Sequence, residues 1–249
     1  MKHLYGPDCI DNLPIGPKVC IGAGTGLGEC YLTPSFIPHY YSDSSNSNNN
    51  INQPPVEYNC FPSEGGHVEY APRNDEEIKL FKYLLHKFES KHRISVERIV
   101  SGLGLANVYD YLSHENPDRI DTTIHDQYLN GGDQQGKIVA ENVKHCTLCC
   151  DAMNIMMSAY GCETGSAAIK WIPIGGLFVT GGITPKNIHH IAGSDSEFMK
   201  SYLHKGRVSD LLERIPLYAV MSEDLGVRGV HKAAVMEYEH YVSYLMHKK

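Results

Sequence analysis

The 249-residue sequence predicts an α/β protein, and three features carry that prediction. β-prone runs flank a glycine-rich turn in residues 18–32, which is the pattern of a hairpin. Apolar residues recur at helical spacing in residues 75–90 and again in 139–160. A buried strand, a diglycine turn and a helix start follow one another in residues 176–185. Alternating strands and helices of this kind define the α/β class, and the length suits one main domain.

A glycine-rich hairpin and a polar insertion come first along the chain. Four glycines alternate with other residues at the hairpin turn: Gly22, Gly24, Gly26 and Gly28. Residues 34–58 then become polar, with serine and asparagine dominating residues 42–50. Because such a composition cannot build a core, we expect residues 34–58 to form a disordered surface insertion.

The second half of the chain is expected to contain a strand that leads into a nucleotide site. The strand of residues 176–183 ends in a diglycine, and Thr184 and Pro185 then provide an N-cap and a first-turn proline that start a helix. A strand, a glycine turn and a helix N-terminus in that order favour phosphate binding. The last expected elements are a short strand at 215–220 and a long helix at 228–247.

Charge and hydropathy exclude several classes of partner. The net charge is −7 and the basic residues are scattered, so no basic patch indicates nucleic acid or an anionic membrane surface. No apolar run is long enough to span a bilayer, and the first residues have no signal-peptide core. We therefore expect a soluble, cytoplasmic protein with a small-molecule partner.

The eight cysteines are expected to be reduced and mostly to act as small apolar side chains. Cys146, Cys149 and Cys150 include a C-x-x-C spacing, which raises the alternative of a zinc site. No second C-x-x-C pair completes four ligands, and the segment is predicted to be helical. A buried helix face is therefore the preferred interpretation, and no metal ligand is assigned.

The glycine turn fits neither of the common nucleotide fingerprints. The alternating glycines match neither G-x-G-x-x-G nor the Walker pattern, and no helix follows them. Gly24, Thr25 and Gly26 could still turn backbone N–H groups and a hydroxyl toward a phosphate. An ordinary hairpin turn is the competing interpretation.

The string Ser63-Glu-Gly-Gly-His67 is the most specific one in the sequence. Its diglycine lets the backbone bend so that Glu64 and His67 approach one point. A carboxylate accepts hydrogen bonds from hydroxyls and an imidazole can donate one, so the pair suits a polyhydroxylated ligand. A surface turn with a solvated glutamate is the alternative.

Three strings taken together resemble one family. They are Gly22-Ala-Gly-Thr-Gly-Leu-Gly28, Glu64-Gly-Gly-His-Val-Glu-Tyr-Ala-Pro72 and Ile94-Ser-Val-Glu-Arg-Ile-Val-Ser-Gly102. In this order they resemble the bacterial-type glucokinases of the hexokinase and actin-like ATPase superfamily. A fourth string, Leu177-Phe-Val-Thr-Gly-Gly-Ile-Thr-Pro185, looks like the adenosine-side strand and turn of that family. The resemblance implies the large domain of a ribonuclease H-like fold.

The resemblance also implies roles for individual residues. The sugar-contacting residues of the family fall on Glu64, His67 and Glu97. The phosphate-contacting residues fall on Gly24, Thr25 and Gly26, and the nucleotide-side glycines on Gly181 and Gly182. The chemistry agrees, since carboxylates and imidazole suit sugar hydroxyls and glycine N–H groups suit phosphate.

Two features of the family have no counterpart in this sequence. Family members open with an Asp-x-Gly-Gly-Thr-Asn phosphate hairpin and later carry an Asn-Asp pair whose aspartate is the general base. Asn74 and Asp75 lie after the sugar motif rather than before the glycine turn, so we interpret them as a helix N-cap region. No catalytic residue is assigned, and we expect an N-terminally truncated chain that lacks most of the small lobe and transfers phosphate slowly or not at all.

The resemblance finally implies an architecture and an activity. Residues 1–227 are expected to form the large domain, and 228–249 a C-terminal helix that lies apart from the core and packs on the small lobe. The activity would be phosphorylation of glucose to glucose 6-phosphate with ATP and Mg²⁺, the first step of glycolysis, in an assembly that is often a homodimer. The alternative is a sugar-binding or regulatory remnant without catalysis.

Overall fold

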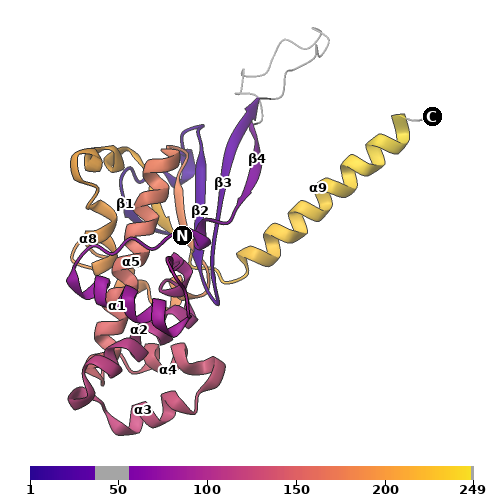
Figure 1. Ribbon diagram of the computed structural model, residues 1–249. Coiled ribbons are helices and arrows are strands. Elements are labelled where there is room, and N and C mark those ends of the chain that lie inside the picture. The colour runs from indigo at the N-terminus through magenta and orange to yellow at the C-terminus, as the bar shows by residue number, and fades with distance from the viewer. Residues whose placement is uncertain (37–55, 248–249) are drawn as a thin grey trace.

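The computed structural model describes residues 1–36 and 56–247, and they form a mixed six-stranded sheet with helices against it (Figure 1). The strand order is β1-β6-β5-β2-β3-β4. The strands are β1 (Lys2–Tyr5), β2 (Lys18–Ala23), β3 (Leu27–Phe36), β4 (Val56–Ser63), β5 (Leu177–Thr180) and β6 (Leu217–Ala219). Strands β2, β5 and β6 run parallel, whereas β1, β3 and β4 extend the two sides by antiparallel pairing. The α/β class predicted from the sequence is confirmed.

The helices pack mainly against one face of this sheet (Figure 1). They are α1 (Asp75–Lys87), α2 (Gly102–Glu115), α3 (Thr122–Leu129), α4 (Gln135–Glu141), α5 (Thr147–Trp171), α6 (Ile183–Lys186), α7 (Ile188–Ile191), α8 (Glu197–Leu203) and α9 (Leu225–His247). Helix α5 is the central one and contacts α2, α8 and β2. Its buried residues occur on all sides, from Leu148 to Tyr160 and Ala168, which is the pattern of a helix enclosed in a core.

Side chains alternate across strand β2 and so define the two faces of the sheet. Val19, Ile21 and Ala23 are at most 1% exposed and face the main core. Cys20 lies on the opposite face, beside a smaller apolar cluster that includes Phe178. The sheet is thus covered by helices on one face and only partly covered on the other.

The hairpin expected at residues 18–32 is present, but its strands are longer than expected. Residues 34–36 and 56–58, assigned from the sequence to a disordered insertion, belong to β3 and β4 and pair in register from Pro34 opposite Tyr58 to Phe36 opposite Val56. Backbone ladder hydrogen bonds form whether or not the side chains are polar, so composition misplaced the strand ends. The rest of the expected insertion lies outside the described residues.

The single helix predicted for residues 139–160 is wrong, because the chain forms α4 and α5 with a break between them. The Asn142 side chain donates to the Ile138 carbonyl oxygen over 2.8 Å at the end of α4. The Cys146 sulfur accepts from the Cys149 N–H at the start of α5. These two caps lie close together and end one helix and begin the next, although the apolar spacing alone is that of one continuous helix.

Two other predicted helix starts have different outcomes. Asn74 is the N-cap of α1, as predicted, and its side chain accepts from the Glu77 N–H over 2.9 Å. Thr184 is not an N-cap, because α6 begins at Ile183 after Gly182. The Thr184 hydroxyl instead donates to the Thr180 carbonyl oxygen over 2.6 Å, which ties the short helix to the end of β5.

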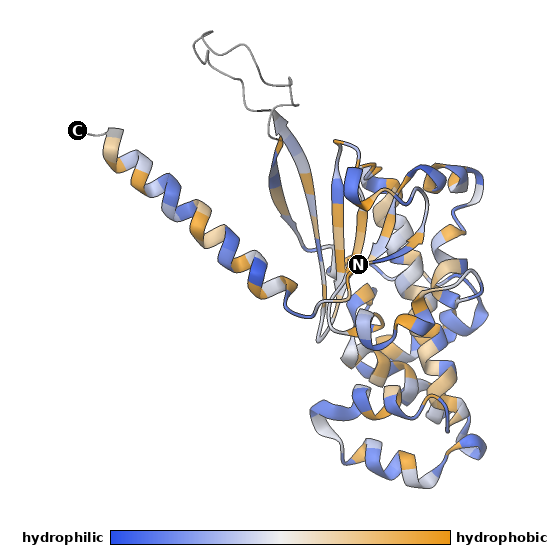
Figure 2. Ribbon diagram, turned by 180° about the vertical axis from the view of Figure 1, so that it is seen from behind, coloured by the Kyte–Doolittle hydropathy of each residue, from blue (hydrophilic) through white to orange (hydrophobic). Residues whose placement is uncertain are grey.

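Helix α9 begins three residues before the predicted start at Arg228 and projects away from the sheet and its helices (Figure 1). Apolar and polar residues alternate along it (Figure 2). Val230, Tyr238 and Tyr241 are 72%, 69% and 59% exposed, so this apolar face has little packing within the chain. None of the helices in residues 1–36 and 56–247 combines the length and apolar character needed to cross a bilayer.

Candidate functional site

Gly24, Thr25 and Gly26 form the turn between β2 and β3 at the C-terminal end of β2. The Gly24 N–H donates to the Gly26 carbonyl oxygen over 2.8 Å, and the Gly24 carbonyl oxygen accepts from the Gly102 N–H over 2.8 Å. Gly102 is the first residue of α2, so the turn is fixed against a helix N-terminus. The Thr25 side chain is exposed, and the space that a side chain on Gly24 would take is open.

The second pair of glycines lies next to this turn. Gly22 pairs with Thr180 in the parallel ladder of β2 and β5, so both strands end at the same edge of the sheet. Gly181 has φ of +82°, and a Cβ there would overlap with the Ala23 carbonyl oxygen. Gly182 follows as the N-cap of α6, and a Cβ there would meet only the ends of the Glu223 and Lys186 side chains, at 4.0 Å. The structure therefore brings together the phosphate-side and nucleotide-side glycines that are 155 positions or more apart in sequence.

A buried tyrosine holds the two strand ends in this relation. The hydroxyl of Tyr160, on α5, lies 3.3 Å from the carbonyl oxygens of Ile21 and Thr180 and 3.3 Å from the backbone nitrogen of Ala23. Its side chain is fully buried. Burial raises the pKa of this phenol to about 12, so the hydroxyl remains protonated and can donate.

Glu97 approaches the same hairpin from the other side. It lies in the 3₁₀ turn Val96–Arg98, and its Oε2 accepts from the Leu27 N–H over 2.8 Å. A Cβ on Gly26 would overlap with this oxygen, so glycine at that position leaves the room that the carboxylate occupies. Ser101 fixes the turn by donating from its hydroxyl to the Glu97 carbonyl oxygen over 2.8 Å.

Glu64 is the N-cap of a 3₁₀ turn, Gly65–His67, and His67 is its last residue; the turn packs on β3. A Cβ on Gly66 would overlap with the Leu27 carbonyl oxygen. The Glu64 carboxylate and the His67 imidazole point the same way, with 3.6 Å between Oε2 and Nε2. Both side chains are exposed. Leu27 therefore contacts the Glu97 carboxylate through its N–H and the diglycine through its carbonyl.

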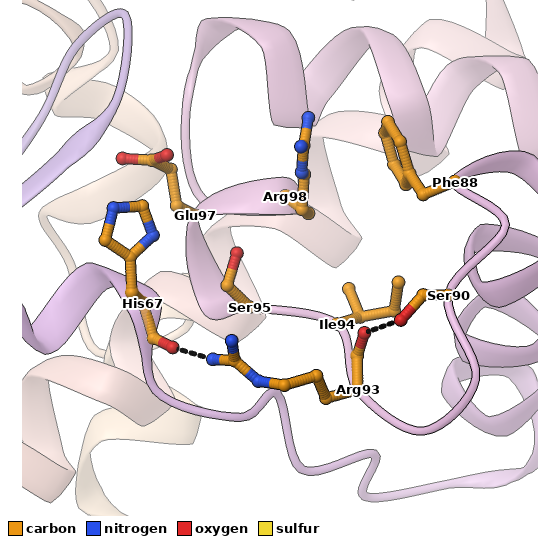
Figure 3. A pocket seen from close by; sticks show the side chains of 8 residues that line it. All are labelled: His67, Phe88, Ser90, Arg93, Ile94, Ser95, Glu97 and Arg98. Atoms are coloured by element: carbon orange, nitrogen blue, oxygen red, sulfur yellow. Dashed lines mark hydrogen bonds between the residues drawn. The ribbon is translucent and has the colours of Figure 1, made fainter.

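A cavity of about 340 Å³ adjoins these residues. Figure 3 shows the His67 imidazole and the Glu97 carboxylate at the same end of it. Arg93 lies along its floor and donates to the His67 carbonyl oxygen, and its Nε donates to the Glu69 carboxylate over 3.0 Å. Glu64 does not line this cavity.

Glu29 also lies beside the diglycine, and it was not predicted from the sequence. It faces inward from β3, opposite Ser63 of β4, and a Cβ on Gly65 would overlap with its carboxylate. Its Oε1 is buried without a hydrogen-bond partner. Burial, followed by the charge of Glu163, raises the pKa of Glu29 to about 7, and Lys170 opposes this. The period-two alternation that places Leu27 on the core side also places Glu29 there, and this was the signal available.

The sequence of this chain resembles those of known proteins. A sequence model of the glucokinase family matches residues 50–237, which is most of the chain. The chain belongs to the glucokinase family. The glucokinase of a Synechocystis species is 36% identical over 227 residues, and the glucokinase of Nostoc punctiforme is 36% identical over 228. These alignments cover 87% of this chain and 58% and 60% of the two relatives, so the chain spans less than two thirds of their length.

Solved structures of the glucokinase family show the same fold. The glucokinase of Balamuthia mandrillaris, solved in complex with glucose, aligns with a TM-score of 0.66 and 20% identity over 88% of this chain and 54% of that one. A glucokinase from an Antarctic psychrotroph aligns with a TM-score of 0.59 and 22% identity over 90% of this chain and 57% of that one. The actin-like ATPase fold expected from the sequence is thus confirmed.

Proposed function

We propose that this glucokinase-family chain carries the sugar and phosphate sites of an ATP-dependent glucose kinase. One observation carries the proposal: Leu27 connects the glycine turn, Glu97 and the diglycine motif within one short stretch of β3. A sugar held by Glu64, His67 and Glu97 would then lie next to a nucleotide phosphate held at Gly24–Gly26. Phosphoryl transfer depends mainly on such positioning and on charge stabilisation.

The nucleotide is proposed to bind along the edge where β2 and β5 end. The missing side chains at Gly24 and Gly182 would leave a glycine cradle in which phosphate oxygens approach the backbone, with the ends of the Lys186 and Glu223 side chains at its border. The N-terminus of α2 adds a favourable dipole. Mg²⁺ is proposed to arrive with the ATP, where it would neutralise phosphate charge.

The phosphoryl acceptor is proposed to be glucose, because the Synechocystis and Nostoc relatives are named glucokinases and the Balamuthia structure contains glucose. The product would be glucose 6-phosphate, and its formation would be the first step of glycolysis in the cytoplasm. Carboxylates that accept from sugar hydroxyls give stereochemical selectivity, since a site built for hydroxyls rejects ligands that leave its groups unpaired.

The exposed apolar face of α9 is proposed to pack on a second lobe of the kinase. Val230, Tyr238 and Tyr241 form a surface that soluble proteins normally cover. A homodimer, which family members often form, is also proposed. Residues 1–227 would then be the large domain, with α9 joining the two lobes.

A second candidate function is sugar binding without catalysis, because Glu64, His67 and Glu97 would serve either function. In the family, an Asn-Asp pair supplies the general base. A hydroxyl nucleophile needs such a base within hydrogen-bond reach. The two functions share one sugar site and differ only in phosphoryl transfer.

The test measures glucose binding by calorimetry and glucose 6-phosphate formation with Mg²⁺ and ATP. It uses this chain and a version extended through the upstream in-frame sequence. Activity in the extended protein that Glu64→Ala abolishes would support the kinase. Binding without activity in both proteins would favour the sugar-binding function, and neither binding nor activity would overturn both. Glu141→Ala, which removes an exposed carboxylate paired with Lys137 on α4, is the matched control.

A further inference from the structure

Three cysteines lie together on the face of the sheet opposite α5, outside the proposed glucose and ATP sites. Cys20 of β2 is directly opposite Cys30 of β3, so the two side chains point to the same face. Cys30 is in turn opposite Pro62 of β4, and Cys60 lies two residues before Pro62 and hence on that face as well. The thiols thus form a row across three neighbouring strands.

A second contact on this face supports the assignment of the side-chain directions. Lys18 is two residues before Cys20, and Tyr58 is two residues before Cys60. The Lys18 ammonium lies 4.0 Å from the centre of the Tyr58 ring, so both side chains reach across β3 on the cysteine face. The hydrogen bond to Cys30 and burial raise the pKa of the Cys20 thiol, and the Lys18 charge opposes this rise without reversing it.

The register suits one particular disulfide. Directly opposite residues of an antiparallel pair have Cα atoms about 4.5–5.5 Å apart, which is inside the range of about 4.4–6.8 Å that disulfides span. Cys30 and Cys60 are diagonal neighbours, and a Cα separation of about 7–8 Å is too long for a bond without backbone movement. Cys20 and Cys30 can therefore form a disulfide, whereas Cys60 is placed to donate a hydrogen bond to the Cys30 sulfur.

We propose that Cys30 is a site of oxidation by hydroperoxides and that Cys20 resolves the oxidised sulfur into a Cys20–Cys30 disulfide. The Cys30 thiolate attacks one peroxide oxygen, the O–O bond breaks, and the departing oxygen takes a proton to leave as water or an alcohol. The Cys20 thiol then attacks the resulting sulfenic acid, an S–S bond forms, and the hydroxyl leaves as water. Both sulfurs are oxidised and the peroxide is reduced, so the step balances.

The surroundings make Cys30 the attacking sulfur. Hydrogen bonds from the Cys20 thiol lower the pKa of Cys30 to about 6, burial opposes this, and a bond from the Cys60 thiol lowers it further. Burial raises the pKa of Cys60, and the bond to Cys30 raises that of Cys20. A thiolate flanked by two protonated thiols is a nucleophile beside its own resolving group. Cys60 is exposed and Cys30 half-buried, which gives a small peroxide access.

The proposed oxidation of Cys30 does not depend on the proposed kinase activity. The cysteines elsewhere have no such cross-strand pairing: Cys146 caps α5, and Cys149 is buried with its pKa raised by burial. In the described ranges 1–36 and 56–247, no group of three or more His, Cys, Asp or Glu side chains is arranged to hold a metal ion.

The test maps disulfides after exposure of the folded 249-residue protein to a few equivalents of hydrogen peroxide. Trypsin combined with cleavage after glutamate separates the three cysteines into peptides 19–29, 30–57 and 58–64. We expect peptides 19–29 and 30–57 to be linked, and linkage to be reversed by dithiothreitol. A link between 30–57 and 58–64 instead, or three alkylated cysteines, would overturn the proposal.

Variants separate the attacking sulfur from the resolving one. Cys20→Ser should leave a sulfenic acid on peptide 30–57 that dimedone traps, and Cys30→Ser should lose both the link and the dimedone adduct. Cys162→Ser, which removes a half-buried thiol on α5, should retain the link. In unoxidised protein at pH 7, Cys30 should react with iodoacetamide roughly tenfold faster than Cys162. Equal rates would contradict the assignment of Cys30, even if a variant failed to fold.

Discussion

The Leu27 N–H donates a 2.8 Å hydrogen bond to Oε2 of Glu97, and these residues are 70 positions apart in the chain. Leu27 directly follows the glycine turn, whereas Glu97 belongs to a 3₁₀ turn before α2. One carboxylate oxygen is thus fixed by the backbone that leads out of the proposed phosphate site. Through this hydrogen bond, the backbone of β3 connects the proposed phosphate site with the proposed sugar site.

Replacing Glu97 should separate the structural role of this hydrogen bond from the sugar contact. Leu27 is only 6% exposed, so Glu97→Ala leaves a buried N–H without an acceptor and should lower the free energy of unfolding by about 1–3 kcal/mol. Glu97→Gln retains a carbonyl acceptor and should unfold close to wild type while losing glucose affinity. Urea unfolding and calorimetric glucose titration measure the two effects. Equal stability of both variants would contradict the structural role.

Adding a methyl group at Gly26 should disturb the same carboxylate. A Cβ there would overlap with Oε2 of Glu97, whereas a Cβ on Gly28 meets nothing within 4 Å. Gly26→Ala should therefore weaken glucose binding roughly tenfold or more, the effect of losing a hydrogen bond to a charged group. The affinity is measured on whichever form of the protein binds glucose. Gly28→Ala is the matched control, and similar losses in both variants would rule out the proposed cause.

Two of the glycines with positive φ, Gly181 and Gly193, allow crowding to be distinguished from backbone strain. Both have positive φ, of +82° and +107°, but only a Cβ on Gly181 would overlap with another atom, the Ala23 carbonyl oxygen. Gly193→Ala should cost about 1 kcal/mol of stability from strain alone. Gly181→Ala should cost more and should also abolish binding of a non-hydrolysable ATP analogue. An unchanged analogue affinity in Gly181→Ala would argue against a nucleotide at this edge.

Glu29 should make stability depend on pH. Burial raises its folded-state pKa to about 7 from an ordinary value of 4.5, so the folded protein binds the proton more tightly than the unfolded chain. The contribution to stability is full below pH 4.5 and is lost as the pH rises to 7, by up to about 3 kcal/mol. Glu29→Gln should remove this slope. Unfolding between pH 4.5 and 8 tests it, with exposed Glu57→Gln as the control that should retain the slope.

Much of this fold was predictable because the relevant signals are local. The hairpin of β2 and β3, the cap at Asn74 and the strand before Gly181 each depend on residues that lie within one turn or one strand. The break between α4 and α5 was missed because Asn142 and Cys146 act as caps only through their side-chain hydrogen bonds. The apolar spacing around them is compatible with one continuous helix.

The sequence by itself determined the family motifs and the glycines that allow close backbone approach. Only the tertiary structure decided which of these residues meet, because sheet pairing brings Gly22 next to Thr180 and places Leu27 between Glu97 and Gly66. The burial of Glu29 and the row of Cys20, Cys30 and Cys60 were likewise decided by register. The turn sets the register of β2 against β3, but β4 and β5 lie far from these strands in the sequence, so their register depends on long-range hydrogen bonds that the local sequence does not specify.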